Sequence, residues 1–136
     1  MGNESAFRGW WEARPDRDRH RVAVLADHAE HLRWLDARVP PGIFGVMPDV
    51  DLGMGRTGRP PAHWREHFEP PSRLRLCGLH GYDGHHRWDA RAAAHAGYAE
   101  LVELAAVVRQ RASSIGSRNF ESAARFDLVT SGTHSF

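Results

Sequence analysis

The sequence predicts an α/β fold in which about four parallel strands alternate with helices, and three observations support this prediction. Short apolar runs rich in β-branched residues recur along the chain and have the length of buried strands. Stretches with apolar residues at helical spacing separate these runs. Each expected strand is followed by a loop rich in Gly, Asp, Arg, His or Ser, which is typical of parallel sheets that bind ligands at the carboxyl ends of their strands.

The first β–α unit begins with the run 21–26, which we expect to be a strand. Asp27 follows as the expected N-cap of a helix, and Glu30 three residues later completes a capping-box pattern. The apolar stripe of this helix consists of Leu32, Leu35 and Val39. Two prolines and a glycine at 40–42 end it.

The second unit has its strand at 43–51 and a glycine-rich loop at 52–58. Pro48 is unfavourable inside a central strand because it cannot donate a hydrogen bond to the ladder. The pair Pro60-Pro61 can start a helix that reaches about Phe68. The pattern therefore predicts a short helix after a long loop.

The third strand is expected at 74–80 with a loop at 81–86, a long helix at about 88–111, and a last strand at 126–130. Alternating strands and helices indicate right-handed βαβ units and a parallel sheet. A closed (β/α)₈ TIM-type barrel needs eight strands and typically about 250 residues. The strand count therefore favours an open sheet or a partial barrel over 21–136, preceded by a loosely ordered lead-in at 1–20.

Composition limits the classes of function. The 136-residue chain has a net charge of +1 with interspersed charges, so no basic block predicts nucleic-acid binding. Cys77 is the single cysteine, which excludes an internal disulfide framework and fits a reducing compartment. No apolar stretch is long enough to predict membrane insertion. We expect a soluble, cytoplasmic protein without membrane or nucleic-acid partners.

All 18 basic residues are arginines, and the sequence contains no lysine. Arginine forms no imine and stays protonated near neutral pH. Schiff-base catalysis through a side chain of this chain is therefore excluded.

Three loops concentrate groups that carry chemistry. In the loop at 49–58, glycines allow close backbone approach, and Arg56 can hydrogen-bond an anionic oxygen. The alternative is a solvated turn with an exposed arginine. After the third strand, His80, Tyr82 and their polar neighbours suit general acid/base work or stacking on a flat ligand. The alternative is a polar loop that satisfies its own backbone.

The third loop follows the last strand at 130–135. Its Ser, Thr and Gly residues can hold a phosphate through backbone N–H and hydroxyl donors. Such runs are also common in ordinary loops and termini.

Together the three loops resemble the barrel domain of fold-type III pyridoxal-phosphate enzymes, and most closely the D-threonine aldolase group, which is related to alanine racemase and D-serine dehydratase. The matching segments are Val50-Asp-Leu-Gly-Met-Gly-Arg-Thr-Gly58, Leu76-Cys-Gly-Leu-His-Gly-Tyr-Asp-Gly-His85 and Leu128-Val-Thr-Ser-Gly-Thr-His-Ser-Phe136. The resemblance covers about 21–136 and implies that the strands are the fourth to seventh of a barrel.

The resemblance also implies roles for individual residues. Arg56 would lie near the phenolic oxygen or ring of pyridoxal 5′-phosphate, and His80 and Tyr82 would be catalytic residues facing the ring and an amino-acid substrate. The phosphate would be bound by Ser131, Gly132, Thr133 and Ser135. Gly81 stands where the family pattern has alanine, and His134 where it has proline.

The family's lysine, its eighth strand and its C-terminal domain with divalent-metal ligands have no counterpart in this sequence. We therefore expect a fragment of a D-threonine aldolase-like enzyme whose full-length parent cleaves or deaminates β-hydroxy D-amino acids, or racemises an amino acid. The fragment is expected to be inactive alone and to bind the cofactor weakly at best.

Two alternatives belong to other classes. The first is a non-catalytic module whose exposed strand edges pair with a second copy or with a partner that supplies the missing strands. The second rests on the sequence His63-Trp-Arg-Glu-His67, which matches the H-x-x-E-H zinc-peptidase pattern. Ten histidines make this spacing easy to reach by chance, no third ligand is indicated, and we predict no metal site.

Overall fold

The computed structural model describes residues 9, 12–13, 22–39, 44–85, 91–114 and 126–130. Strands and helices follow one another through these ranges in the order β1 (Ala23–Ala26), α3 (Ala29–Arg38), β2 (Gly45–Asp51), α4 (Pro61–His67), β3 (Arg75–Leu76), β4 (Gly78–Tyr82), α5 (Arg91–Ser114) and β5 (Asp127–Thr130). The expected alternation of strands and helices is confirmed. Nearly all of the lead-in expected at 1–20 lies outside the described residues.

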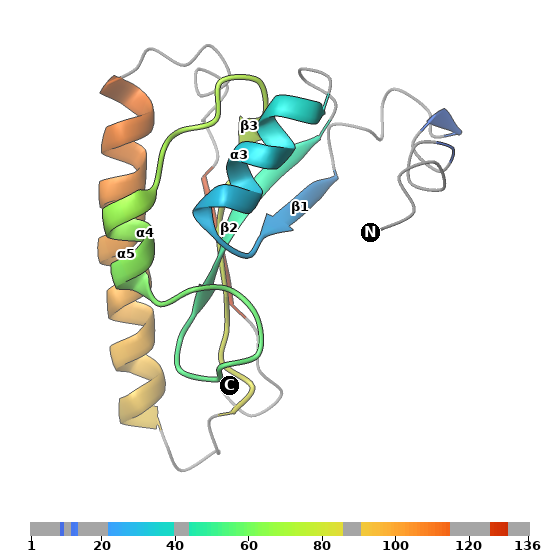
Figure 1. Cartoon of the computed structure of the whole chain (residues 1–136). Helices are drawn as coiled ribbons and strands as arrows, with labels where there is room; N and C mark the ends of the chain where they lie inside the picture. Colours follow the sequence, from blue (N-terminus) through green and yellow to red (C-terminus); the bar gives the residue numbers. More distant parts are fainter. Residues whose placement is uncertain are drawn as a thin grey trace.

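All paired strands are parallel, in the order β1-β2-β4-β5, and β3 also pairs with β2. Apart from β3 and β4, which both lie beside β2, strands that are consecutive in the chain are therefore neighbours in the sheet. Right-handed crossovers that always advance in one direction place their helices on one face of the sheet. An open doubly wound sheet would instead reverse its strand order and carry helices on both faces. The arrangement in Figure 1 is that of a partial barrel, as the sequence predicts.

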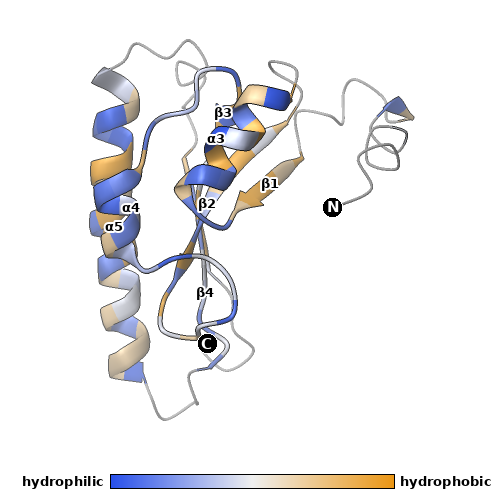
Figure 2. Ribbon diagram, viewed as in Figure 1, coloured by the Kyte–Doolittle hydropathy of each residue, from blue (hydrophilic) through white to orange (hydrophobic). Residues whose placement is uncertain are grey.

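One hydrophobic core lies between the sheet and the helices. Val46, Val50 and Leu79 face the helices, and Trp64 of α4 and Leu104 of α5 are fully buried against the same cluster. Figure 2 shows β1 as largely hydrophobic, whereas α3 and α5 carry both hydrophilic and hydrophobic residues. The helices are thus amphipathic covers of a single face. Within the described ranges, no helix combines the length and apolar character that a bilayer crossing requires.

The opposite face of the sheet carries no helix among the described residues. In the strand register, Leu25 pairs with Met47, and His80 pairs with Val129. Leu25 and Val129 are 41% and 40% exposed, which is unusual for apolar residues within a sheet. In a closed barrel this face would be the packed interior.

The third expected strand is split into two. Val46 pairs with Leu76, but Asp49 pairs with His80, so the β3–β4 side carries one extra residue between these pairs. This is the geometry of a β-bulge. Pro48 lies in the same interval of β2, where the interrupted ladder tolerates a residue that has no N–H. Strand β4 then continues to Tyr82, two residues beyond the expected end.

The expected N-cap of the first helix is wrong by one residue. His28, not Asp27, has the extended backbone of the cap, and its ring Nδ1 accepts a hydrogen bond from the His31 N–H at 3.1 Å. The Asp27 N–H instead donates to Nδ1 of His31 at 3.3 Å. Histidine can replace aspartate here because an unprotonated ring nitrogen is also an acceptor.

Candidate functional site

The glycine-rich loop folds back over the end of β2. Arg59 N–H donates to the Asp49 carbonyl at 3.1 Å, and Asp51 N–H donates to the Arg59 carbonyl at 2.9 Å. Arg59 therefore pairs with Val50 as an isolated parallel bridge. The carboxylate of Asp51 accepts the N–H groups of Gly53 and Gly55 at 2.9 and 3.0 Å. These bonds close the loop on itself.

Gly58 lets this loop pass close to β2. Its φ is +81°, and a Cβ at this position would lie 2.5 Å from the Asp49 carbonyl oxygen. Only glycine combines a left-handed backbone with so close an approach. The loop covers Asp49, whose exposed fraction is only 2% although it lies on the helix-free face.

Asp49 and His80 form the central polar contact of the site. They are register partners on β2 and β4, so their side chains point to the same face of the sheet. Asp49 Oδ1 lies 2.7 Å from His80 Nδ1. The Thr57 side chain, from the glycine-rich loop, also hydrogen-bonds the Asp49 carboxylate. One buried carboxylate thus joins β2, β4 and the loop.

The ionisation of Asp49 follows from these contacts. Burial raises the pKa of this carboxyl, but hydrogen bonds from His80 and Thr57 and the nearby positive charge of Arg56 outweigh burial and leave its pKa below the ordinary value. Asp49 is therefore a carboxylate at neutral pH.

Arg56 and Tyr82 lie at the same edge of the sheet. The guanidinium carbon of Arg56 lies 4.2 Å from the centroid of the Tyr82 ring, within the range of a cation–π contact. Tyr82 is the register partner of Asp51, two pairs beyond Asp49 and His80 and therefore on the same face. A small open cleft at this edge is lined by Asp49, Val50, Asp51, Met54, Arg56, Thr57 and Tyr82.

The fold thus brings Arg56, His80 and Tyr82 together at the carboxyl ends of β2 and β4, where parallel α/β sheets bind ligands. A guanidinium held over an aromatic ring can bind an anionic oxygen, and the imidazole and the phenol can accept or donate protons. The four predicted phosphate-binding residues, Ser131, Gly132, Thr133 and Ser135, lie outside the described residues. Thr130, the last described residue before them, pairs with Gly81 beside this edge.

Asp83 is a second buried carboxylate, next to Tyr82 and 1% exposed. The Tyr98 hydroxyl of α5 donates a hydrogen bond to its Oδ2. In the described part of the chain, its Oδ1 has no hydrogen-bond partner. This contact ties the start of α5 to the end of β4.

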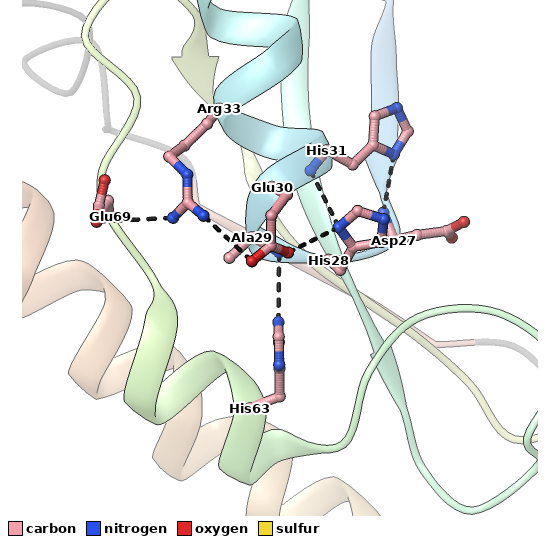
Figure 3. Close-up of polar contacts among 8 residues, drawn as sticks. All are labelled: Asp27, His28, Ala29, Glu30, His31, Arg33, His63 and Glu69. Atoms are coloured by element: carbon pink, nitrogen blue, oxygen red, sulfur yellow. Dashed lines mark hydrogen bonds and ion pairs between the residues drawn. The ribbon is translucent and has the colours of Figure 1, made fainter.

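The H-x-x-E-H motif lies on α4, one of the outer helices. The rings of His63 and His67 are 4.8 Å apart, and His63 Nε2 accepts the Ala29 N–H at 3.4 Å (Figure 3). Burial, followed by the charge of His67, lowers the pKa of His63. Across the residues that the structure describes, no three His, Cys, Asp or Glu side chains gather as a possible metal site. The described residues therefore provide no third zinc ligand beside His63 and His67.

Figure 3 also shows the polar contacts around the start of α3. His28 Nδ1 lies 3.0 Å from a Glu30 carboxylate oxygen, and Glu30 also pairs with Arg33 at 3.2 Å (Figure 3). Arg33 in turn approaches Glu69 at 3.6 Å. Arg33 thus links Glu30 of α3 to Glu69, which follows α4, through ion pairs between exposed side chains. The His28 Nδ1 that accepts the His31 N–H cannot donate to Glu30 at the same time.

Sequence reasoning did not single out Asp49, Thr57 or Tyr98. Asp49 and Asp51 have the two-residue spacing of side chains on one face of a strand. This spacing could have predicted that both aspartates lie on the same face as His80 and Tyr82 of the neighbouring strand. Nothing in the sequence indicates the contact of Tyr98, because the angle at which α5 packs on β4 determines it.

Comparison with known proteins supports the fold. No family model matches the chain, and no curated protein matches it. The solved structure of alanine racemase from Corynebacterium glutamicum is similar, with a TM-score of 0.61 and 13% sequence identity. The match covers 100% of this chain and 40% of the racemase chain, so this chain spans less than half of the racemase. At this identity the likeness shows the fold, and it confirms the partial barrel.

Proposed function

We propose that this chain is part of a fold-type III pyridoxal-phosphate barrel of the D-threonine aldolase type, and that it retains a non-covalent site for the cofactor. The observation that carries the proposal is Arg56 stacked on Tyr82 beside the Asp49–His80 pair, at the carboxyl edge of the sheet. The three loop motifs and the racemase-like fold support the same assignment.

The residues of this chain fit non-covalent binding only. Arg56 would hold an anionic oxygen, Tyr82 and His80 would border the ring, and the hydroxyls and backbone N–H groups of the run 131–135 would receive the phosphate. The sequence has no lysine, so no side chain can attach the cofactor. When bound in a complete enzyme, the pyridine ring supplies an electron sink.

The activity of a complete parent enzyme is part of the proposal. A parent that adds a lysine to this site would cleave or deaminate a β-hydroxy D-amino acid, or racemise an amino acid. In such an enzyme His80 and Tyr82 would be the candidates for moving protons, because both lie at the edge where the ligand would sit. This chain alone is expected to show none of these activities.

The binding claim can be tested without an aldehyde. Pyridoxine 5′-phosphate cannot form imines, so calorimetric titration measures non-covalent affinity, and pyridoxine is the comparison that lacks the phosphate. We expect weak binding of the phosphate ester, with Arg56→Ala lowering affinity by roughly 2–5-fold, as suits an exposed charge-assisted contact. Arg38→Ala is the matched control, because Arg38 lies in the last turn of α3, away from the carboxyl edge. Equal affinities for the two arginine variants would contradict the assigned site.

A second candidate function is assembly through the helix-free face. The exposed apolar residues Leu25 and Val129 favour it, since exposed apolar side chains on a sheet commonly mark an interaction site. Within the described residues, β1 and β5 each have one strand neighbour, which leaves backbone groups for pairing with another chain. Two copies, or a partner that supplies further strands, would bury this face.

This candidate predicts a discrete dimer in sedimentation equilibrium. Leu25→Asp should shift the population toward monomer, because it places a charge in the buried interface. Val102→Asp is the control, since Val102 lies on the outer helix α5 and is 57% exposed. A well-folded monomer at all concentrations would rule assembly out.

A further inference from the structure

Asp49 and His80 differ sharply in accessibility. Asp49 is 2% exposed, whereas the side chain of His80 is 17% exposed. The loop that carries Thr57 and Gly58 lies against Asp49 and hydrogen-bonds its carboxylate, which leaves the imidazole as the more exposed member of the pair. Through its contact with the more exposed His80, Asp49 can act on a ligand that it does not itself touch.

We propose that Asp49 is the positioning residue of the site and that it holds the neutral His80 ring with its hydrogen on Nδ1. Nε2 then carries the lone pair and is the ring atom that can accept a hydrogen bond or a proton. This inference deepens the proposed function and rests on it only for the identity of the ligand.

The contact itself defines which nitrogen carries the hydrogen. The Oδ1···Nδ1 distance is 2.7 Å, which is in the range of charge-assisted hydrogen bonds. A carboxylate has no hydrogen to donate, so the nitrogen that bonds to it must be the donor. Thr57 also hydrogen-bonds this carboxylate, and a hydroxyl facing a carboxylate is the donor. Both partners therefore match an ionised Asp49.

The backbone holds Asp49 in place as firmly as these side chains do. Its carbonyl accepts the Trp64 indole N–H at 2.9 Å and the Arg59 N–H at 3.1 Å. Trp64 is fully buried, so the carbonyl is anchored to the hydrophobic core. A carboxylate fixed in this way sets the orientation of the His80 ring as well as its tautomer.

A purely structural role would be to join β2 to β4. The parallel ladder between these strands already does so, with Asp49, Val50 and Asp51 paired to His80, Gly81 and Tyr82. Both roles predict some loss of stability when Asp49 is replaced. Only the positioning role predicts a change in the tautomer of His80.

The test is long-range ¹H–¹⁵N correlation NMR on the full chain without ligand, at a pH where neutral imidazole predominates. The His80→Gln spectrum identifies the His80 signals among the ten histidines. We expect the wild-type ring to be protonated on Nδ1, and Asp49→Asn to lower the Nδ1–H to Nε2–H ratio by at least about tenfold.

Two control variants make the result specific. Asp51→Asn alters the neighbouring carboxylate, which bonds Gly53 and Gly55 rather than His80, and should leave the tautomer unchanged. Thr57→Val removes the other donor to Asp49 and should also keep the Nδ1–H form.

A wild-type ring protonated on Nε2 overturns the proposal, even if Asp49→Asn does not fold. An unchanged ratio in folded Asp49→Asn overturns it as well. Because no ligand is present, the outcome is independent of whether pyridoxine 5′-phosphate binds.

Discussion

Replacing glycine by alanine at two positions of the same loop separates backbone strain from steric contact. Gly55 and Gly58 both have positive φ, +67° and +81°. A Cβ at Gly55 would have nothing within 4 Å, whereas a Cβ at Gly58 would lie 2.5 Å from the Asp49 carbonyl oxygen and 2.8 Å from its carbon. The two variants therefore differ mainly in whether the added methyl group collides with β2.

The magnitudes follow from these geometries. A left-handed alanine costs about 1–2 kcal/mol, and the lower entropy of the unfolded chain returns about 0.4–1 kcal/mol. Gly55→Ala should therefore destabilise the fold by about 1 kcal/mol. Gly58→Ala must also displace the strand or the loop, which adds about 1–3 kcal/mol, so we expect about 2–4 kcal/mol in total.

Urea unfolding followed by circular dichroism measures both variants. With a slope of about 2 kcal/mol per molar urea, the midpoint should fall by about 0.5 M for Gly55→Ala and about 1–2 M for Gly58→Ala. The urea midpoint should be highest for the wild type, lower for Gly55→Ala and lowest for Gly58→Ala. Equal midpoints for the two variants would refute the inference that the loop lies directly against Asp49.

Three further predictions concern the scaffold. The Asp36 carboxylate accepts the N–H groups of Ser72, Arg73 and Leu74 at 2.8–2.9 Å; burial raises its pKa, but these bonds outweigh it and leave the pKa below its usual value. Asp36→Asn should cost about 1–2 kcal/mol at pH 7. This difference in urea midpoint should shrink as the pH falls below the ordinary carboxyl pKa of about 3.9, and disappear below the lowered native pKa; a difference that does not shrink on acidification would contradict this. Burial raises the pKa of the Cys77 thiol, so a thiol reagent should react with it at pH 8 only after urea unfolds the chain. Rapid labelling of the native protein would show that Cys77 is accessible and would contradict this prediction. Trp64→Phe removes the indole bond to the Asp49 carbonyl and should cost about 1–2 kcal/mol in urea unfolding, because the Arg59 N–H still satisfies that carbonyl; an unchanged midpoint would exclude a stabilising role for the bond.

Local patterns were enough to predict the order of strands and helices. The apolar run before Asp27 and the stripe of Leu32 and Leu35 mark β1 and α3, because burial on one face imposes these periods. The N-cap was misplaced by one residue, since the cap is chosen by where the backbone leaves the helix, and His28 supplies an acceptor there. The split between β3 and β4 depends on the partner strand and therefore has no local signal.

The site was only partly predictable for the same reason. Arg56, His80 and Tyr82 stand out because polar groups cluster after apolar runs. The role of Asp49 depends on its register with His80 and on a loop that returns to cover it, and both are tertiary features. Tyr82 was expected in a loop, but its pairing with Asp51 extends β4 to include it.

Mapping a ligand onto the chain by NMR tests the central claim most directly. The amide signals of the ¹⁵N-labelled protein would be followed during titration with pyridoxine 5′-phosphate. We predict shifts at Gly53, Gly55, Arg56 and Tyr82, at the carboxyl edge of β2 and β4, and the loss of these shifts in Arg56→Ala. Shifts confined to the histidines of α4, or no shifts at saturating ligand, would contradict the proposal that this edge is the remnant of a pyridoxal-phosphate site.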